Sequence, residues 1–350
     1  MLGILYAALG AFTFSLNNVT MRRGVVTGSV LQGMALTVPI GGLSFLVMAV
    51  AFGDLGQVAL IPAAAALWLA TQGVVHFVMG RYCNYRANQL MGVNLAAPVI
   101  QLQVPFAMLL AVATLHEPFT ALQVIGSALM LGGSFTTQTK ANGRRKRPSA
   151  PLSAAIATNP VHADTAETRA NDARATFQPH VVSGYIFAFA GAACYGSSPL
   201  LAREAFLRAP GISTVAAGCV AYAAATLVFS FALLKPGSWR DIRSMKRENL
   251  PWFLAAAVLV AISQALVYAS LAVAPLMVVT PILQLSLVFR LFLSQIINRD
   301  HEVMNAAVLI GSFAAVLGSI LVSLETRALT AFFSLPTGLA AFLGYRLIGH

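Results

Sequence analysis

The side chains best suited to chemistry in this chain stand inside long apolar stretches. His76 lies deep in one stretch, and imidazole is the side chain whose charge changes near neutral pH. Arg290 lies well inside another, where a central arginine costs roughly 2.5–3.5 kcal/mol to place. We therefore consider His76 as a group that transfers protons or contacts a solute. Arg290 is considered as a cation that attracts an anionic or carboxylate-bearing solute.

Each of these residues also has a structural interpretation, which the sequence leaves open. His76 can be a neutral, hydrogen-bonded packing residue, and Arg290 can be bonded to carbonyl groups at a helix end. The chemical roles predict that His76→Ala alters a pH dependence and that Arg290→Gln weakens the binding of an acidic solute. The structural roles predict neither effect.

Carboxylates are missing from the centres of the apolar stretches. Each of the 11 acidic residues falls in a predicted loop, a linker or a helix end. They are Asp54, Glu117, Asp164, Glu167, Asp172, Glu204, Asp241, Glu248, Asp300, Glu302 and Glu325. A proton relay built on a carboxylate in the middle of a membrane is therefore excluded.

The motifs of known enzyme classes are incomplete or missing in this sequence. The dipeptides at 116–117 and 301–302 are both His-Glu, as at the start of a zinc-protease motif, but the required second histidine is replaced by Thr120 and Asn305. No nucleophile elbow and no glycine-rich phosphate loop is present. The three cysteines show no metal or disulfide spacing. We expect no enzyme, no catalytic residue, no metal and no cofactor.

Amide and hydroxyl side chains supply the remaining candidates. Gln101 and Gln284 follow Pro98 and Pro281 at the same spacing, and a proline frees a carbonyl that a nearby amide can bond. Because the two positions are equivalent, we expect Gln101 and Gln284 to face each other across a pseudo-two-fold axis between the halves. Interhelical hydrogen bonding is the alternative role for such amides. The residues expected to line a cavity are Asn17, Gln72, His76, Gln101, Tyr195, Ser198, Gln264, Tyr268, Gln284 and Arg290.

An ideal helical repeat makes a further prediction about one of these stretches. Gln72 and His76 are four residues apart and share a helix face. The same repeat turns Arg81 away from that face, toward the end of the helix, where its stem can reach the membrane surface.

The elements that must position these residues are membrane helices. The chain is 58% hydrophobic and 9% charged, with a mean hydropathy of +0.78, whereas soluble domains carry roughly 25% charged residues. Ten apolar runs approach or exceed the ~20 residues that an α-helix needs to cross hydrocarbon. They lie near 2–21, 30–52, 65–85, 92–115, 119–137, 182–201, 212–234, 252–271, 276–297 and 303–324.

The chain repeats itself. Residues 95–134 recur at 278–319, with Pro98, Gln101 and Phe106 matched by Pro281, Gln284 and Phe289, and Gly3, Gly10 and Arg22 are matched by Gly184, Gly191 and Arg203. Since each repeat holds an odd number of crossings, the two must lie in opposite orientations. The sequence therefore predicts an all-α integral membrane protein of ten transmembrane helices in two inverted five-helix repeats.

Four segments follow from this division. Residues 1–137 form the first repeat, 138–181 a flexible basic and polar linker, 182–326 the second repeat, and 327–350 a short apolar tail that we interpret as an interfacial helix. The net charge of +11 comes largely from loops, which argues for topology rather than nucleic-acid binding. The positive-inside rule places both termini outside the cytoplasm.

Each half resembles the repeat of the drug/metabolite transporter superfamily, and specifically its EamA-type ten-helix members. The resemblance is carried by Pro98 and Pro281, by the acidic turn at 116–118, and by the glycine-rich helix that follows it. It implies an alternating-access carrier with its cavity between the halves. Its substrates would be amino acids, organic acids or similar small metabolites, often moved outward.

We accordingly expect a multi-pass protein of the cell inner (plasma) membrane. Its expected partners are a small-molecule solute and the lipid bilayer, with no nucleic acid and with a homodimer possible. Small residues spaced four apart, at Ala128/Gly132, Gly311/Ala315 and Ala314/Gly318, predict close helix packing within the chain or across a dimer. The alternatives to a carrier are a passive channel or facilitator and, less favoured, a lipid flippase.

Overall fold

The computed structural model describes residues 2–115, 119–143, 179–273, 282–323 and 342–348, together with positions 279, 336 and 338. Within them the chain is helical except for one pair of short strands. The undivided long helices are α1 (Leu2–Thr27), α2 (Val30–Ala51), α8 (Ala121–Gly143), α10 (Val181–Arg208), α11 (Thr214–Leu233), α13 (Leu250–Val273), α15 (Ser286–Ile297) and α16 (Ala306–Ser323).

The third and fourth helices of the first half are divided. The third consists of α4 (Ala63–Gly73), the π-helix η1 (Val74–Gly80) and α5 (Arg81–Met91), and the fourth consists of α6 (Val93–Ile100) and α7 (Gln103–Leu115). Short helices lie in the connections, namely α3 (Leu55–Ala59), α12 (Ser238–Arg243) and the 3₁₀ turn η4 (Arg299–His301).

Length and composition make this a multi-pass membrane protein. In the described residues, seven helical stretches are long and apolar enough to cross a bilayer, and three shorter apolar helices accompany them. Large apolar side chains such as Leu43, Val50 and Phe313 are exposed, as expected where lipid rather than water surrounds the helices. The prediction of a helical, multi-pass fold is confirmed at this level.

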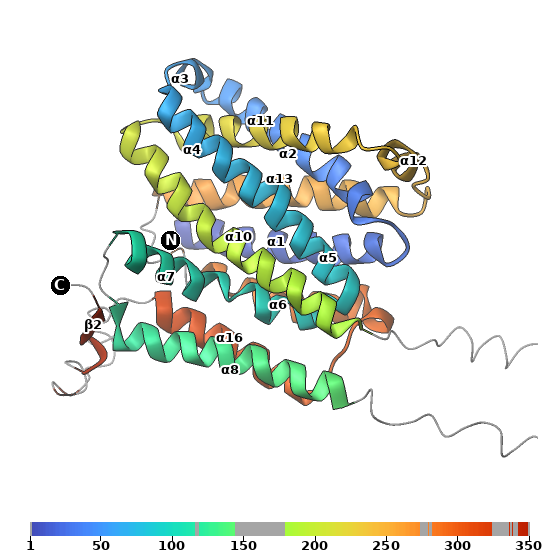
Figure 1. Ribbon diagram of the computed structural model, residues 1–350, viewed down its shortest axis with the longest axis vertical. Helices are drawn as coiled ribbons and strands as arrows, with labels where there is room; N and C mark the ends of the chain where they lie inside the picture. Colours follow the sequence, from blue (N-terminus) through green and yellow to red (C-terminus); the bar gives the residue numbers. More distant parts are fainter. Residues whose placement is uncertain are drawn as a thin grey trace, which may run out of the picture.

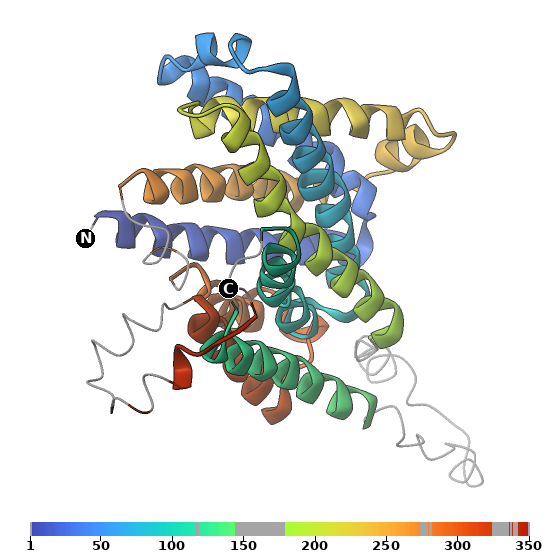
Figure 2. The same ribbon diagram turned by 60° about the vertical axis from the view of Figure 1, so that its left-hand side comes forward.

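The helices pair across the two halves of the chain. Figures 1 and 2 show α1 alongside α13 in the middle of the molecule, with α2 and α11 toward one end and α8 and α16 at the other. α10 runs against α4, η1 and α5, and it also packs on α7, while α1 packs on α15. Most long helices therefore have their main neighbour in the other half.

The contact between α8 and α16 is made by backbone against backbone. A Cβ added at Gly126 would lie 2.7 Å from the Gly318 carbonyl oxygen, and one added at Gly133 would collide with the Gly311 carbonyl oxygen. Because rising numbers on α8 meet falling numbers on α16, the two helices are antiparallel. The prediction of close packing within the chain is confirmed for Gly311 and Gly318, but it is wrong for Gly132, which meets nothing within 4 Å.

Two helix breaks occur at equivalent places in the halves. α6 ends at Ile100 and α7 begins at Gln103, and the residues at 284–285 form the same kind of turn just before α15. In both, the chain tightens to hydrogen bonds three residues apart, Leu102 N to Val99 O and Leu285 N to Ile282 O, each 3.0 Å. Pro98 lies inside α6, one turn before the break, which agrees with its missing N–H donor. Pro281 lies outside the described residues.

The tail differs from expectation where it is described. Residues Arg346–Ile348 form strand β2, which pairs antiparallel with β1 (Phe119–Thr120). An interfacial helix is therefore wrong for these residues. The linker from 144 to 178 and the turn at 116–118 lie outside the described residues.

Candidate functional site

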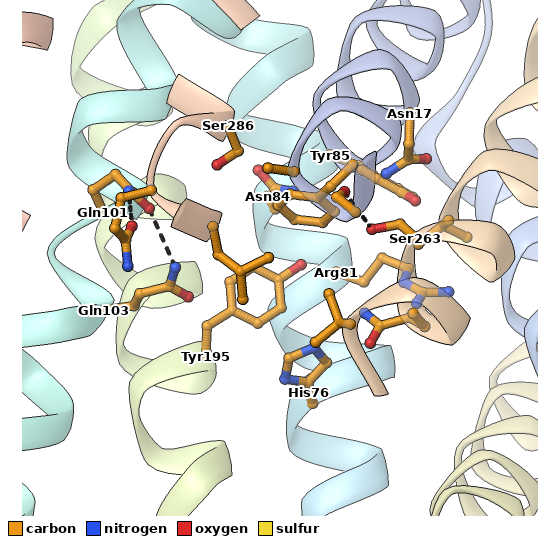
Figure 3. Close-up of a pocket in the computed structure, with 18 residues that line it drawn as sticks. Asn17, His76, Arg81, Asn84, Tyr85, Gln101, Gln103, Tyr195, Ser263 and Ser286 are labelled. Atoms are coloured by element: carbon orange, nitrogen blue, oxygen red, sulfur yellow. Dashed lines mark hydrogen bonds between the residues drawn. The ribbon is translucent and has the colours of Figure 1, made fainter. Parts of the chain in front are cut away.

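A polar cavity of about 220 Å³ lies among helices of both halves. Of the predicted residues, it is lined by Asn17, His76, Gln101, Tyr195, Gln264 and Gln284. It is also lined by side chains that the sequence interpretation missed, namely Arg81, Asn84, Tyr85, Gln103, Ser263 and Ser286. Figure 3 shows the labelled members of this group converging on a common space, with the Tyr195 ring near its centre.

The two equivalent glutamines meet in the cavity wall. The Gln101 amide nitrogen donates to the Gln284 side-chain oxygen, and the Gln103 amide nitrogen donates to the Gln101 side-chain oxygen at 3.3 Å. Both Gln101 and Gln284 occupy the helix breaks described above. Their predicted meeting at the junction of the halves is thus present, and the amides bond each other while lining the cavity. The only sequence feature that could have identified Gln103 as a cavity residue is its position close to Pro98 and Gln101.

A second group of predicted residues gathers around Ser198. Its hydroxyl lies 2.8 Å from the Gln72 amide nitrogen and 3.0 Å from Nδ1 of His76. The His76 ring also lies against the Tyr195 ring, with centroids 4.7 Å apart. Gln72 and Ser198 therefore support His76 from behind, while His76 and Tyr195 face the cavity.

The π-helix η1 explains why Arg81 was misplaced by sequence reasoning. In this segment the Arg81 N–H donates to the carbonyl of His76, five residues earlier, in place of the four-residue bond of an α-helix. The wider turn brings His76 and Arg81 to the same face, and both line the cavity. The expectation that Arg81 points away and reaches the membrane surface is wrong, since its side chain is buried at 4% exposure.

Arg81 is fixed by neighbours from two other helices. Its guanidinium donates to the Thr37 carbonyl at 3.0 Å and to the Tyr222 hydroxyl at 3.1 Å. It also lies 5.3 Å from the centroid of the Phe77 ring and 5.8 Å from that of Tyr222. Stacking on aromatic faces suits a weakly hydrated, planar cation in an apolar site.

Arg290 borders the cavity without lining it. It is 3% exposed, and its guanidinium carbon stands 4.9 Å from the centroid of Phe14, a lining residue. Its Nε is buried with no hydrogen-bond partner in the described residues. The side chain of Tyr268, the last of the predicted set, lies outside the described residues.

The charged side chains that the structure places at the cavity are cations. No carboxylate is among the described residues that line it. In the part of the chain that the structure describes, ion pairs join Arg22 to Glu302 and Arg208 to Glu204, and none involves Arg81 or Arg290. Groups of His, Cys, Asp and Glu that could hold a metal ion are also absent from the described residues.

One end of the interface between the halves is closed by a buried ion pair. Arg22, at the end of α1, lies 3.3 Å from Glu302, and the two side chains are 1% and 0% exposed. The Glu302 carboxylate also accepts from the backbone N–H groups of Val93 and Asn94, at 2.8 and 3.0 Å, at the beginning of α6. A carboxylate is favoured there because helix N-termini present unpaired N–H groups.

Further polar contacts tie the same end together. Asn298 donates to the Val19 carbonyl at 2.8 Å, and Ser294 donates to the Asn94 side chain at 2.7 Å. Gly92, with φ of +86°, begins the turn into α6 and leaves room for the Glu302 carboxylate, 2.6 Å from where a Cβ would stand. Glu302 thus bonds the first half of the chain; its sequence equivalent, Glu117, lies outside the described residues.

Comparison with known proteins bears on this arrangement. Residues 1–138 match the family model of the EamA-like transporter family. Through this segment the chain is similar to that family, whose members are membrane transporters and generally not enzymes. The resemblance drawn from the sequence is thus confirmed for residues 1–138.

Other comparisons add less. No curated protein matches this EamA-like transporter. A solved structure described only as a crystal structure of a protein has 17% identity and a TM-score of 0.49 over 92% of this chain and 98% of its own.

Proposed function

We propose that this EamA-like transporter is a secondary carrier that exports small polar metabolites, such as amino acids or organic acids, by alternating access. The observation that carries the proposal is the polar cavity between residues of the first repeat (1–137) and of the second (182–326). Both contribute polar walls, Gln101 from one and Gln284 from the other. Polar groups inside a membrane are costly, and they are expected where they face a solute path.

Packing supports two inverted five-helix repeats, ten membrane helices in all. α1 and α10 are the first helices of the two repeats, and α4–α5 and α13 are the third. The packing of α1 on α13 therefore corresponds to the packing of α10 on α4–α5. The two glycine contacts between α8 and α16 correspond to each other in the same way, since Gly126 and Gly133 are equivalent to Gly311 and Gly318. Equivalent helices that run antiparallel are what a two-fold axis in the membrane plane produces.

Cavity size supports a small solute. Drug-sized ligands occupy pockets of roughly 300–1,000 Å³. The cavity here is about 220 Å³, which suits a metabolite of few atoms better than a lipid or a large drug. This favours a carrier over a flippase.

The closed end supports alternating access over a channel. A channel needs a continuous path, whereas Arg22, Glu302 and the amides beside them close the interface of the halves at one end. The basic residues in the loops at this end support a cytoplasmic position for it, and we propose the inner (plasma) membrane of the cell as the location.

Counterflow in proteoliposomes tests the proposal. Vesicles are loaded with unlabelled amino acids or organic acids, and the uptake of a labelled trace is measured. A carrier gives transient accumulation and trans-stimulation by internal substrate. Uptake without trans-stimulation would indicate a channel, and scrambling of labelled phospholipid in place of solute uptake would indicate a flippase.

A further inference from the structure

We propose that the cavity is selective for small organic anions, and that Arg81 and Arg290 bind the carboxylate of the transported solute. This inference rests on the proposed carrier function and names its substrate class. It follows from two buried cations from opposite halves, Arg81 in the cavity wall and Arg290 beside it, which have no carboxylate of their own among the described residues.

Arg290 provides the stronger evidence for an anion site, because its guanidinium lacks described hydrogen-bond acceptors. A guanidinium has several N–H donors and no acceptor, so burial requires partners for those donors. None of the Arg290 donors has a hydrogen-bond acceptor among the described residues, and its Nε is fully enclosed. The guanidinium instead lies over the face of Phe14, with 4.9 Å between the guanidinium carbon and the ring centroid, and Phe14 itself lines the cavity.

Arg81 supplies the second cation and is already oriented. Two of its donors are held by Thr37 and Tyr222, which leaves the others without a described acceptor on a side chain that lines the cavity. The π-helix that brings Arg81 to this face is an uncommon device, and such turns are frequent at functional sites. An arginine fixed before binding loses little freedom when it grips a carboxylate in two places.

The other walls fit an organic acid rather than a cation. Tyr195, Tyr85 and Phe14 offer ring surfaces for a carbon skeleton, and Gln103 and Gln264 offer amides for a further polar group. A cationic solute would meet the charge of Arg81 in the cavity lining and that of Arg290 beside it, with no carboxylate among the described lining residues. Repulsion in a low-dielectric site is strong, so amines are excluded on charge.

The halves also provide a natural control for Arg81. Position 81 corresponds to Gln264 in the second repeat, at the spacing that relates Gln101 to Gln284, and Gln264 lines the cavity too. Arg81→Gln therefore places in the first half the side chain that the second half already carries. This substitution removes the charge and keeps a polar group of similar reach.

The test uses probes matched in shape but not in charge. Purified full-length protein is mixed with benzoate, benzamide or benzylamine, and with succinate, succinamide or 1,4-diaminobutane, and thermal stability reports binding. We expect stabilisation by at least one acid and by neither its amide nor its amine. Arg81→Gln and Arg290→Gln should each weaken acid binding about 10- to 100-fold, as expected for the loss of a charged hydrogen bond.

Controls separate misfolding from loss of the site. Arg81→Lys retains a charge and should bind acid more tightly than Arg81→Gln. Arg208→Gln changes an exposed arginine that pairs with Glu204 and should bind as the unaltered protein does. Inorganic phosphate is included, and stabilisation by phosphate with none by the acids would overturn the carboxylate assignment.

The outcome also distinguishes this inference from the carrier proposal. Counterflow of a neutral or cationic solute, unaffected by Arg81→Gln and Arg290→Gln, would refute anion selectivity and leave the carrier function standing. Acid binding that depends on both arginines, without counterflow of the bound acid, would support the site and refute the carrier. Equal stabilisation by acid and amide would also refute the inference.

Discussion

Two of the buried arginines, Arg22 and Arg290, should respond in opposite ways to the same substitution. Arg22 is paired with Glu302 at 3.3 Å, whereas Arg290 has no described carboxylate or hydrogen-bond acceptor. Replacement by Met keeps the length of the chain and removes the charge. We expect Arg290→Met to stabilise the solute-free protein and Arg22→Met to destabilise it.

The magnitudes follow from what each guanidinium touches. A central arginine costs roughly 2.5–3.5 kcal/mol in a membrane helix, and a desolvated contact with an aromatic face returns roughly 0.5–2 kcal/mol. Arg290 has the contact with Phe14 but no described hydrogen-bond acceptor, so its removal should raise the free energy of unfolding by about 0.5–3 kcal/mol. Arg22→Met leaves a buried Glu302 carboxylate unpaired, which costs about 3–5 kcal/mol.

Thermal and denaturant unfolding of both variants in nanodiscs, without added solute, measures whether each substitution raises or lowers the free energy of unfolding. The contrast requires no assay of transport, so it stands apart from the identity of the substrate. A loss of stability in Arg290→Met comparable to that in Arg22→Met would refute the reasoning. It would mean that Arg290 serves as a structural arginine bonded at a helix end.

Three further predictions concern other parts of the fold. Gly126→Ala should lower the free energy of unfolding by about 1–3 kcal/mol, because the new Cβ meets the Gly318 carbonyl oxygen at 2.7 Å. Gly132→Ala should be neutral or slightly stabilising. Equal effects of the two substitutions in denaturant unfolding would contradict the close contact between α8 and α16. His76→Ala removes a ring that lines the cavity and contacts Ser198 and Tyr195, so it should raise the solute concentration that half-saturates counterflow, whereas unchanged saturation would limit His76 to packing. Burial, with Arg23 and Arg22 nearby, lowers the pKa of His301 from 6.5, so the folded state binds fewer protons than the unfolded state and stability should fall as pH drops below that value; His301→Gln should flatten this part of the melting profile, and an unaltered slope would count against it.

Much of the architecture was readable from the sequence because apolar length and internal repetition are strong signals. The matched positions Gln101 and Gln284 predicted a junction between the halves, and the two side chains meet there. The same periodicity placed Gln72 and His76 on one face, and both contact Ser198. Each of these inferences needs only regular helix geometry and a constant spacing.

The predictions from sequence fail where helix geometry is irregular or where segments distant in the sequence meet. Arg81 was turned the wrong way because one π-turn shifts the phase of a helix, and residue types along η1 give no warning of it. Glu302 bonds the N-terminus of α6 more than two hundred positions away, a contact that no local pattern encodes. Ser263 and Ser286 are ordinary residues for packed membrane helices, so composition could not single them out.

The position of Glu302 has a consequence for how this end of the transporter can open. One carboxylate bonds the end of α1 through Arg22 and the start of α6 through two backbone donors. Withdrawing it removes the counter-charge of Arg22 and leaves the N–H groups of Val93 and Asn94 without their acceptor in the same movement. Partial release therefore gains nothing, and this end of the transporter should exchange between a bonded and a released state rather than open by degrees.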